Sequence, residues 1–477
     1  MRRGAITVFL SLVLTIVLSL ILAVTEGARI SAIRMKFECV ADIGMNSVLA
    51  EYHRQMLEQY DLLFVDMSYG TGSGSISNTQ AHLKQYMQKN YETDSAIGLL
   101  HFRDFLAMDA GEASITEYSV ASDQCGEVLK RQVTDYMKDY PTGAALDAVS
   151  GWATEIGTLE SRDIQGERES YQAEIDSIEL PKQEVEEGVF EEVPLNNPAD
   201  AANATRSSGV LNLVTDSSEE ISKVKITPEQ YISHRNCQQG TGVCREAQEL
   251  TGAANDLVFE AYLFRKLGYY GEELEKSLLK YQIEYVIAGE DTDWKNLESV
   301  AKKLLLWREV ANVIYIFSDS AKIAEAEAMA AALAAVTLQP ALLVPVQYTI
   351  LFAWAYVESL MDVRCLLKGE KVPLMKTSQD WKTGINSILD VKGSMSGGEE
   401  GQGRGLSYKD YLMVMIFLMD SETRTMRGMD IMEMDIRKTL GNSNFRLDAC
   451  FDTFKAQMSV SSRYGYFYQL ERQYGFY

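Results

Sequence analysis

The most distinct hydrophobic pattern lies at the start of the chain. Residues 5–24 contain no charged side chain, whereas Arg2 and Arg3 precede them and Glu26 and Arg29 follow them. As a helix, this segment rises by about 30 Å, which is the thickness of the hydrocarbon layer of a bilayer. We predict a transmembrane helix here. The basic pair favours a cytoplasmic N-terminus in the cell membrane and places the bulk of the chain outside the cytoplasm.

Two other interpretations of the N-terminus stay open. A cleaved secretory signal usually has an apolar region of about 7–15 residues and ends at a small-x-small site, and the run found here is longer. The other is a prepilin-type leader, because residues 1–4 are short and basic and end in Gly4. They resemble the leader of type IV pilin-like proteins, in which a peptidase would cut here between Gly4 and Ala5. Pilins usually carry Glu at the fifth mature position, where this chain has Phe9, and this difference argues against a major polymerising pilin.

An amphipathic pattern follows the apolar segment. Apolar residues recur at three- and four-residue spacing over residues 27–66, with charged residues between them. They are Ile30, Ile33, Phe37 and Val40, then Val48, Tyr52, Met56, Tyr60 and Leu63. We predict that the membrane helix continues into an amphipathic helix that lies against a globular head. The Gly- and Ser-rich residues 69–78 predict a loop.

Small hydroxyl residues recur every four positions within the apolar segment. They are Thr7, Ser11, Thr15 and Ser19. A helix places this spacing on one face, and small residues allow two membrane helices to approach closely. This face is a candidate packing surface, although scattered small residues are also ordinary in membrane helices.

The remaining chain divides by composition into three parts. Residues 25–180 read as a mostly helical extracytoplasmic region. Residues 181–222 are rich in Glu, Asn and Ser and predict a solvated acidic linker. A calcium site is the alternative reading of these carboxylates, but the ordered D-x-D-x-D-G spacing is absent. Residues 223–477 read as a second, helical domain.

Helical periodicity dominates this second domain. The predicted helices cover 245–267, 271–288, 294–318, 320–338, 346–367, 409–419 and 421–440. Residues 328–357 carry no charge and are interrupted by Pro340 and Pro345, which favours a buried helical hairpin over a hairpin that enters the membrane or a second span. The alternation after Phe445 predicts one or two strands at the end of the domain. The fold class is therefore mainly α with a small C-terminal β element.

The composition of the chain excludes some classes of structure and function. The chain has 477 residues, 46% of them hydrophobic, and a net charge of −23. The hydrophobic share excludes wholesale disorder, and the charge makes the protein a poor partner for nucleic acid, whose phosphates require cations. Eight prolines disfavour a loop-rich all-β chain.

The sequence shows no recognisable catalytic pattern. The four histidines form no H-E-x-x-H motif, and neither a G-x-S-x-G elbow nor a phosphate-binding loop occurs. We therefore predict no catalytic, metal or cofactor-binding residues. Cys237 and Cys244 are close enough in sequence to close a short disulfide loop, which an extracytoplasmic location allows. Glu358 and Asp362, four residues apart, read with Arg364 as a solvated helix end or a packed ion pair.

Several longer segments resemble a family of unknown function from Gram-positive, often anaerobic, bacteria. They are residues 1–30 and 46–66, EYVIAG (284–289), LLLWREVANVIYIFSD (304–319), AWAYVESLMDVRCLLKGEKVPLMKTSQDW (353–381), GLSYKDYLMVMIFLMD (405–420) and FRLDACFDTF (445–454). Members commonly occur beside TadE-like pseudopilins and other components of tight-adherence (Flp) pilus systems, and the N-terminus resembles TadE/TadG-like proteins. The resemblance carries over no catalytic residue.

Two functions follow from these observations. The first is a non-enzymatic, single-pass envelope protein that serves the assembly of a tight-adherence pilus-like or secretion apparatus, with the lipid bilayer and pseudopilin or apparatus proteins as partners. The second is a membrane-tethered extracytoplasmic enzyme or ligand-binding module of the cell envelope.

Overall fold

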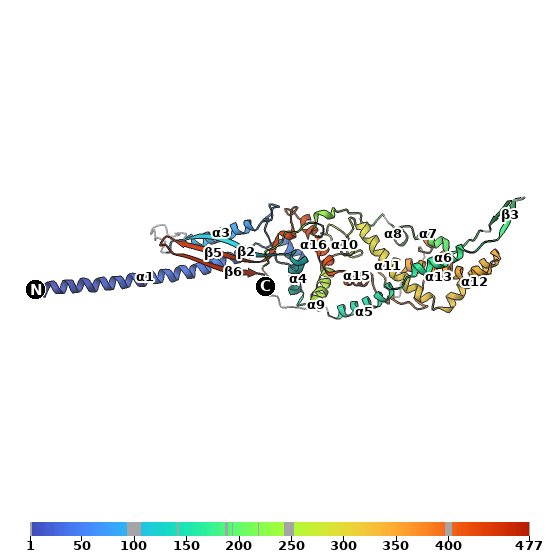
Figure 1. Cartoon of the computed structure of the whole chain (residues 1–477), viewed down its shortest axis with the longest axis horizontal. Coiled ribbons are helices and arrows are strands. Elements are labelled where there is room, and N and C mark those ends of the chain that lie inside the picture. The colour runs from blue at the N-terminus through green and yellow to red at the C-terminus, as the bar shows by residue number, and fades with distance from the viewer. Residues whose placement is uncertain are drawn as a thin grey trace. The chain divides into compact units, whose positions relative to one another are not determined.

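The computed structural model describes residues 2–92, 106–140, 143–186, 189–192, 194–217, 219–242, 252–395 and 403–476. The chain is mainly helical and divides into two compact units (Figure 1). The sheet unit is formed by residues 1–136, 231–255 and 432–477. The helical unit is formed by residues 137–230 and 256–431, so it is inserted in sequence between segments of the sheet unit. The sequence pattern predicts consecutive regions that meet near residues 181 and 222. The two units of the structure are not consecutive in sequence, because segments that are distant in the chain share one β-sheet.

The sheet unit begins with one long helix, α1 (Arg2–Leu49). The amphipathic continuation is confirmed as far as Leu49, but the helix expected over residues 27–66 ends there. His53 then caps the short helix α2 (Arg54–Tyr60), accepting a hydrogen bond from the Met56 amide. Asp61 takes a left-handed conformation at φ 54° and ends that helix.

The β-sheet is antiparallel and centred on β5 (Cys450–Ser462). One edge of β5 pairs with β2 (Met108–Val120), and the other pairs with β1 (Val65–Asp66) and then β6 (Phe467–Gly475). The predicted C-terminal strands are therefore confirmed as β5 and β6. Strand β2 lies within residues 25–180, which are mostly helical as expected, and it was not predicted.

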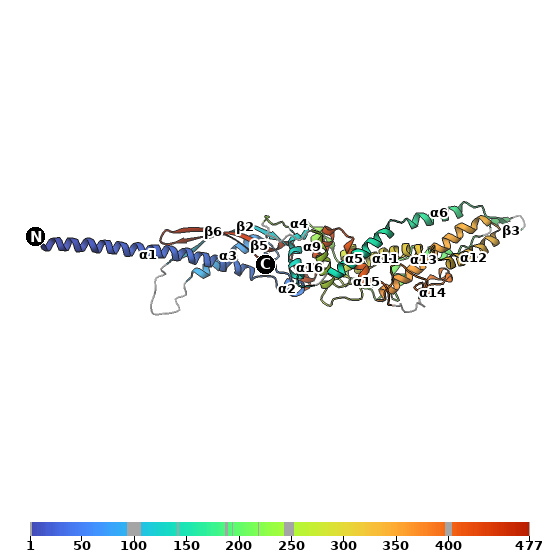
Figure 2. The ribbon, with the colours of Figure 1, turned by 90° about the horizontal axis from the view of Figure 1, so that it is seen from below.

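Helix α3 (Ile76–Tyr91) and the second half of α1 pack beside this sheet (Figure 2). Together they enclose the core of the sheet unit. Its buried members include Ile33, Phe37, Val40, Met45, Val48, Leu83, Met87, Ile115, Phe451, Phe454 and Val460. The spacing of the α1 members is the three- and four-residue spacing seen in the sequence, because only one face of α1 meets the core.

The helical unit holds most of the remaining elements. Its longer helices include α5 (Gly143–Glu160), α6 (Ile164–Asp176), α11 (Asp293–Ile316), α12 (Ser320–Thr337), α13 (Leu343–Leu367) and α15 (Tyr408–Phe417). The short elements are β3 (Lys182–Glu186), β4 (Val189–Glu192), α7 (Ala199–Thr205), α8 (Val210–Val214), α10 (Gln282–Ala288) and α14 (Val391–Met395). Helices α4 (Asp123–Met137), α9 (Gly252–Lys266) and α16 (Ser421–Lys438) contain residues of both units.

Most predicted helices of the C-terminal half are confirmed within a few residues. For the helix expected over 245–267, residues 245–251 lie outside the described residues. The exception is 271–288, where only α10 is helical. Gly271, at φ 93°, lies in a turn in which Tyr269 and Glu272 exchange backbone hydrogen bonds, and this turn prevents an earlier helix start.

The uncharged segment 328–357 forms a hairpin inside the helical unit. Helix α12 ends at Leu338, which is left-handed at φ 54°, and Pro340 starts the turn into α13. Residues Pro340–Leu367 are long and apolar enough to cross a membrane, yet 67% of the most apolar window is buried. Helix α13 packs against α11, α12, α6 and α7. The buried hairpin is therefore the reading that the packing supports.

Residues 181–222 differ from a fully solvated linker. The Glu-rich part contains the hairpin of β3 and β4. The following part contains α7 and α8, whose Ala199, Ala202 and Leu211 are buried, and both helices contact α13. The run of glutamates ends before α7, and the small apolar residues of α7 and α8 pack into the core.

Candidate functional site at the apolar helix of the sheet unit

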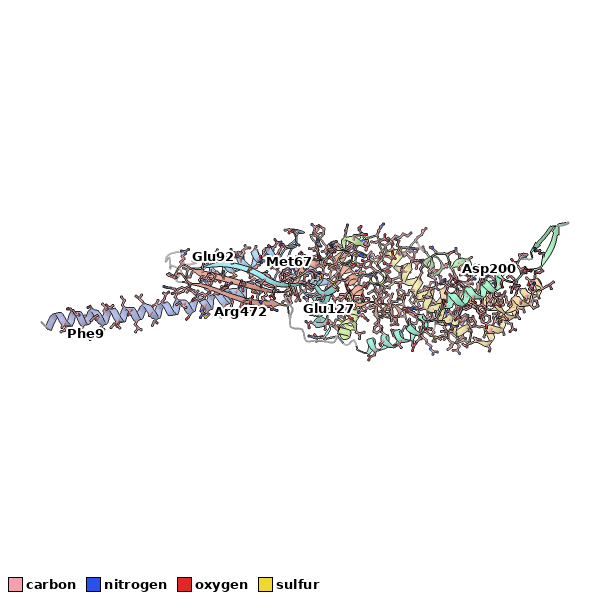
Figure 3. All side chains as sticks on the ribbon, in the orientation of Figure 1. Phe9, Met67, Glu92, Glu127, Asp200 and Arg472 are labelled. Atoms are coloured by element: carbon pink, nitrogen blue, oxygen red, sulfur yellow. The ribbon has the colours of Figure 1, made fainter. Side chains whose placement is uncertain are left out.

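The first half of α1 is apolar and uncovered. Its large side chains from Ile6 to Val24 are between 40% and 66% exposed, and the most apolar window is not buried at all. Figure 3 shows these side chains projecting from the helix around Phe9. The segment is long and apolar enough to cross a membrane, a test that a signal sequence also passes. Such a surface is unfavourable in water and favourable in a bilayer.

The hydroxyl groups in this segment are satisfied within the helix. Thr7 and Ser11 donate hydrogen bonds to the carbonyl oxygens of Gly4 and Val8, each at 2.9 Å. Thr15 and Ser19 donate hydrogen bonds to the carbonyl oxygens of Ser11 and Ile16, each at 2.8 Å. The four side chains therefore add little polarity to the surface, which suits a lipid environment. Their role as a packing face stays a prediction, as does cleavage between Gly4 and Ala5.

The second half of α1 is fixed to the sheet unit. Ile33 and Ala41 are fully buried, and Phe37 is 3% exposed. At Gly44 a Cβ atom would lie 3.2 Å from a methyl carbon of Leu83, so the glycine permits the close approach of α3. The apolar half and the packed half are parts of one continuous helix.

The junction between the two halves is held by the turn that joins β5 and β6. We call residues 463–468 the aromatic turn. The Tyr466 hydroxyl donates a hydrogen bond to Glu26, and this bond raises the pKa of Tyr466. The guanidinium of Arg29 pairs with Glu26 and lies 4.0 Å from the centre of the Tyr464 ring. The sequence shows these aromatic residues but cannot show that they meet α1, because more than 400 residues separate the two segments.

The face of α1 that points away from the core is also partly apolar. Met35 is 67% exposed, Ile43 is 48% exposed, and Cys39 is exposed between them. These three residues recur every four positions and form what we call the outer stripe. It extends an apolar surface beyond the candidate membrane span.

A buried ion cluster lies in the helical unit. Arg308 donates to Asp362 at 3.0 Å, and Lys376 contacts both Glu358 and Asp362. Burial opposes ionisation of Asp362, but the charges of Lys376 and Arg308 hold its pKa below the usual value. Of the two readings of Glu358 and Asp362, the solvated helix end is wrong, because both side chains are buried in ion pairs; the expected partner Arg364 is wrong as well. Arg364 pairs instead with Asp216.

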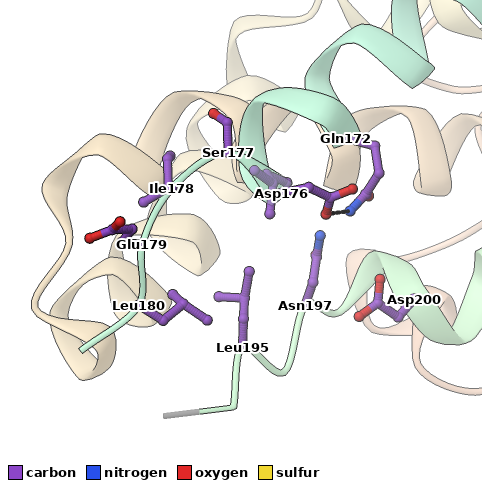
Figure 4. Close-up of a pocket in the computed structure, with 10 residues that line it drawn as sticks. Gln172, Asp176, Ser177, Ile178, Glu179, Leu180, Leu195, Asn197 and Asp200 are labelled. Atoms are coloured by element: carbon purple, nitrogen blue, oxygen red, sulfur yellow. Dashed lines mark hydrogen bonds between the residues drawn. The ribbon is translucent and has the colours of Figure 1, made fainter. Parts of the chain in front are cut away.

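A hollow of about 410 Å³ lies beside the end of α6 in the helical unit (Figure 4). Asp176 and Asp200 line it, and burial together with the charge of Asp176 raises the pKa of Asp200. Asn197 at its wall is engaged by Thr349 and by the Ala199 amide. In the described part of the chain, no three His, Cys, Asp or Glu side chains are placed to hold a metal ion.

The predicted disulfide stays a prediction. Cys237 is half-buried in the sheet unit, whereas Cys244 lies outside the described residues.

The geometry defines a mainly helical protein with an N-terminal apolar helix that could anchor it in a membrane. Residues 188–462 match a family of unknown function, DUF5702, and because the match spans more than half of the chain, the protein belongs to this family. The matched span contains strand β5 but not α1, β2 or β6. Neither a curated protein nor a solved structure matches the chain.

Proposed function

We propose that this protein is a single-pass, membrane-anchored envelope protein with a structural or assembly role in a tight-adherence (Flp) pilus-like or secretion apparatus. One observation carries the proposal. Helix α1 is a continuous rod whose first half is apolar and exposed and whose second half belongs to the core of the sheet unit. Such a rod passes mechanical load between a bilayer and a folded head without a hinge. The role is mechanical and includes no reaction.

The outer stripe supports assembly in particular. Met35, Cys39 and Ile43 leave an apolar strip on α1 beside the membrane span, where a helix of a neighbouring subunit would cover it. The apolar strip suits helix-to-helix contact of the kind that pseudopilin-like proteins make. The resemblance of the N-terminus to TadE/TadG-like proteins supports the same class of partner.

The anchor is tested by the mature N-terminus. Mass spectrometry of the protein purified from its native membranes is expected to find a chain that begins at Met1 or at Ala5. A chain that begins after Val24 would overturn the proposal, because the anchor would have been removed. Recovery of the intact chain in the soluble cytosolic fraction would overturn it as well.

The assembly role is tested by crosslinking at Cys39. Membranes that carry the Cys125→Ser protein are treated with a short bismaleimide, which joins exposed thiols of neighbouring chains. We expect a crosslinked product with a second copy or with a pseudopilin-sized protein, and its loss in the Cys39→Ser, Cys125→Ser variant. A membrane-bound protein with no product that depends on Cys39 would contradict the assembly role and leave the anchor intact.

A second candidate function is a membrane-tethered ligand-binding module. One observation favours it, a basic hollow in the helical unit that is lined by Arg168, Arg206 and Lys302. Binding of a small anion at that hollow would support this candidate without contradicting the anchor.

A further inference from the structure

The aromatic turn lies at a defined height along α1. Its contacts reach Glu26 and Arg29, which follow the apolar segment that ends at Val24. At 1.5 Å per residue these two positions lie roughly 3 Å and 8 Å beyond the segment. The headgroup layer on each side of a bilayer is about 5–8 Å thick, the difference between the hydrocarbon core and the whole membrane. The turn is therefore level with the lipid headgroups when the apolar segment spans the hydrocarbon.

The exposed side chains of the turn match the chemistry of that layer. Phe467 is 64% exposed and Tyr464 is 46% exposed, and Arg463 is exposed beside them. Aromatic rings are enriched where hydrocarbon meets water, and an arginine can place its charge among lipid phosphates. A single exposed phenylalanine on a loop is ordinary, but here the exposed rings lie beside the end of a membrane-length helix.

We propose that the aromatic turn inserts into the outer interface of the bilayer and forms a second membrane contact of the sheet unit. This inference rests on the proposed membrane anchoring. A single helix leaves a head free to tilt about its point of exit. With Phe467 and Tyr464 in the interface, the sheet unit is held at two points and presents the outer stripe of α1 at a fixed height and direction.

Fluorescence quenching tests the contact. The full-length chain is placed in lipid nanodiscs that contain lipids brominated near the headgroup, which quench nearby tryptophans. All five native tryptophans lie in the helical unit, so the unsubstituted chain supplies the background. Phe467→Trp reports on the turn, and Gln473→Trp, an exposed position near the other end of β6, is the matched control.

We expect the Phe467→Trp signal to be quenched at least threefold more strongly than the Gln473→Trp signal. Equal quenching in a chain that stays in the nanodiscs would overturn the contact and leave the anchor intact. A chain that fails to enter nanodiscs would contradict the anchor itself. The two failures are thus distinguishable.

A second inference comes from the helical unit and does not depend on the membrane. A hollow of about 300 Å³ lies between α6, the end of α7 and α11. Three cations line it, Arg168, Arg206 and Lys302, and Ile164 and Leu305 form apolar parts of its wall. Such a concentration of positive charge is unexpected in a chain with a net charge of −23.

The cations are only partly compensated. Arg206 is held by the two carboxylate oxygens of Glu309, at 3.1 Å and 2.5 Å, and its guanidinium lies 3.9 Å from the centre of the Tyr356 ring. Lys302 is 61% exposed and lies 3.3 Å from Glu298. Arg168 is half-buried and has no ion-pair partner within the described residues. Burial and the neighbouring Arg206 charge lower its pKa, and the negative charge of an added anion would offset this by favouring the charged guanidinium.

We infer that this hollow binds an oxyanion, a phosphate or a carboxylate group carried by a small ligand. Arg168 supplies the free fork of donors that such groups accept, and Lys302 adds a second cation. Glu309 competes with the ligand for Arg206. The apolar wall receives the uncharged part of the ligand.

Calorimetric titration of the full-length chain in detergent tests the site, with inorganic phosphate, glycerol 1-phosphate and acetate as probes at low salt. At least one probe is expected to bind saturably. Arg168→Gln should weaken that binding at least tenfold, and Glu309→Gln should strengthen it severalfold because Arg206 becomes free. Lys295→Gln, which removes an exposed charge from the same helix, is the control. The order of the probes separates phosphate from carboxylate ligands.

Two outcomes would overturn the inference. One is the absence of saturable binding of every probe to the unsubstituted chain. The other is an Arg168→Gln protein that melts at the temperature of the unsubstituted chain and binds the probes equally well.

Discussion

Glu284 is a fully buried carboxyl group near which the described residues place no compensating cation. One of its oxygens accepts hydrogen bonds from the Tyr408 hydroxyl at 2.8 Å and the Tyr270 amide at 2.9 Å. The other has no hydrogen-bond partner in the described part of the chain. Burial therefore raises the pKa of Glu284 from 4.5 to about 7.

This pKa makes stability depend on pH. Between pH 4.5 and about 7 the folded protein retains a proton that the unfolded chain loses, so the free energy of unfolding falls as the pH rises. The total change is about 3 kcal/mol, and Glu284→Gln should remove it. Urea unfolding of the full chain at pH 5 and pH 8 measures the difference. The exposed Glu325→Gln should keep the dependence of the unsubstituted chain, and an unaltered pH dependence in Glu284→Gln would contradict the argument.

The buried ion cluster makes a second prediction for single residues. Lys376→Met keeps the length of the side chain but leaves Glu358 and Asp362 side by side without their shared cation. Breaking a buried pair in this way costs roughly 3–5 kcal/mol. Lys368→Met removes a half-exposed partner of Asp216 and should cost less than about 1 kcal/mol. Thermal unfolding of both variants compares the two costs, and equal melting temperatures would refute the expectation.

The sequence allows part of this cluster to be anticipated. Two carboxylates four residues apart on an apolar helix face indicate sites for buried ion pairs, and Glu358 and Asp362 each pair with a cation. Their partners could not be predicted, because Arg308 lies 54 positions from Asp362 and Lys376 comes from an irregular segment after α13. The contact between the aromatic turn and α1 could not be predicted for the same reason. Its residues are recognisable, but their contact with α1 depends on the fold.

At the level of elements, the second half of α1 is stabilised by its packing against the sheet. Phe37 is 3% exposed in the shared core, whereas Met35 on the opposite face is 67% exposed. Phe37→Ala should lower the free energy of unfolding of the sheet unit by about 3–5 kcal/mol through the cavity it leaves. Met35→Ala should change it by less than about 0.5 kcal/mol. Hydrogen exchange of the β5 and β6 amides reports the difference, and equal protection in the two variants would argue against α1 as part of this core.

Helices and strands were unequally predictable. The helices of the C-terminal half carry local signals, such as the Asp319 cap of α12 and the capping box of Ser407 and Asp410 at α15. Strand β2 has irregular pairing at three places along β5, which breaks the alternation that would reveal it. Its partner also lies more than 300 residues away in the chain. Local pattern therefore predicted the helices and the central strand β5 but concealed its neighbour β2.

For the whole molecule, we predict that the first half of α1 determines whether the protein is found in the membrane fraction. Leu14 and Val17 lie near the middle of the apolar segment. Arginine at such positions opposes insertion by about 2.5–3.5 kcal/mol each. The double variant Leu14→Arg, Val17→Arg should therefore leave the membrane fraction, whereas Leu14→Ile, Val17→Leu should remain there. Sedimentation of cell membranes followed by immunoblotting measures the distribution. A double arginine variant that stays in the membrane fraction would show that another segment holds the chain.

The late position of β5 and β6 has a consequence for biosynthesis. Residues 450–475 leave the ribosome about 400 residues after the end of α1. At 5–20 residues per second this interval lasts roughly 20–80 s. Throughout that time the face of α1 that carries Ile33, Phe37 and Val40 lacks the strands that will cover it. Each nascent chain therefore exposes this apolar face until β5 and β6 have been synthesised, and a stop codon placed before β5 would leave the face permanently uncovered and open to proteolysis.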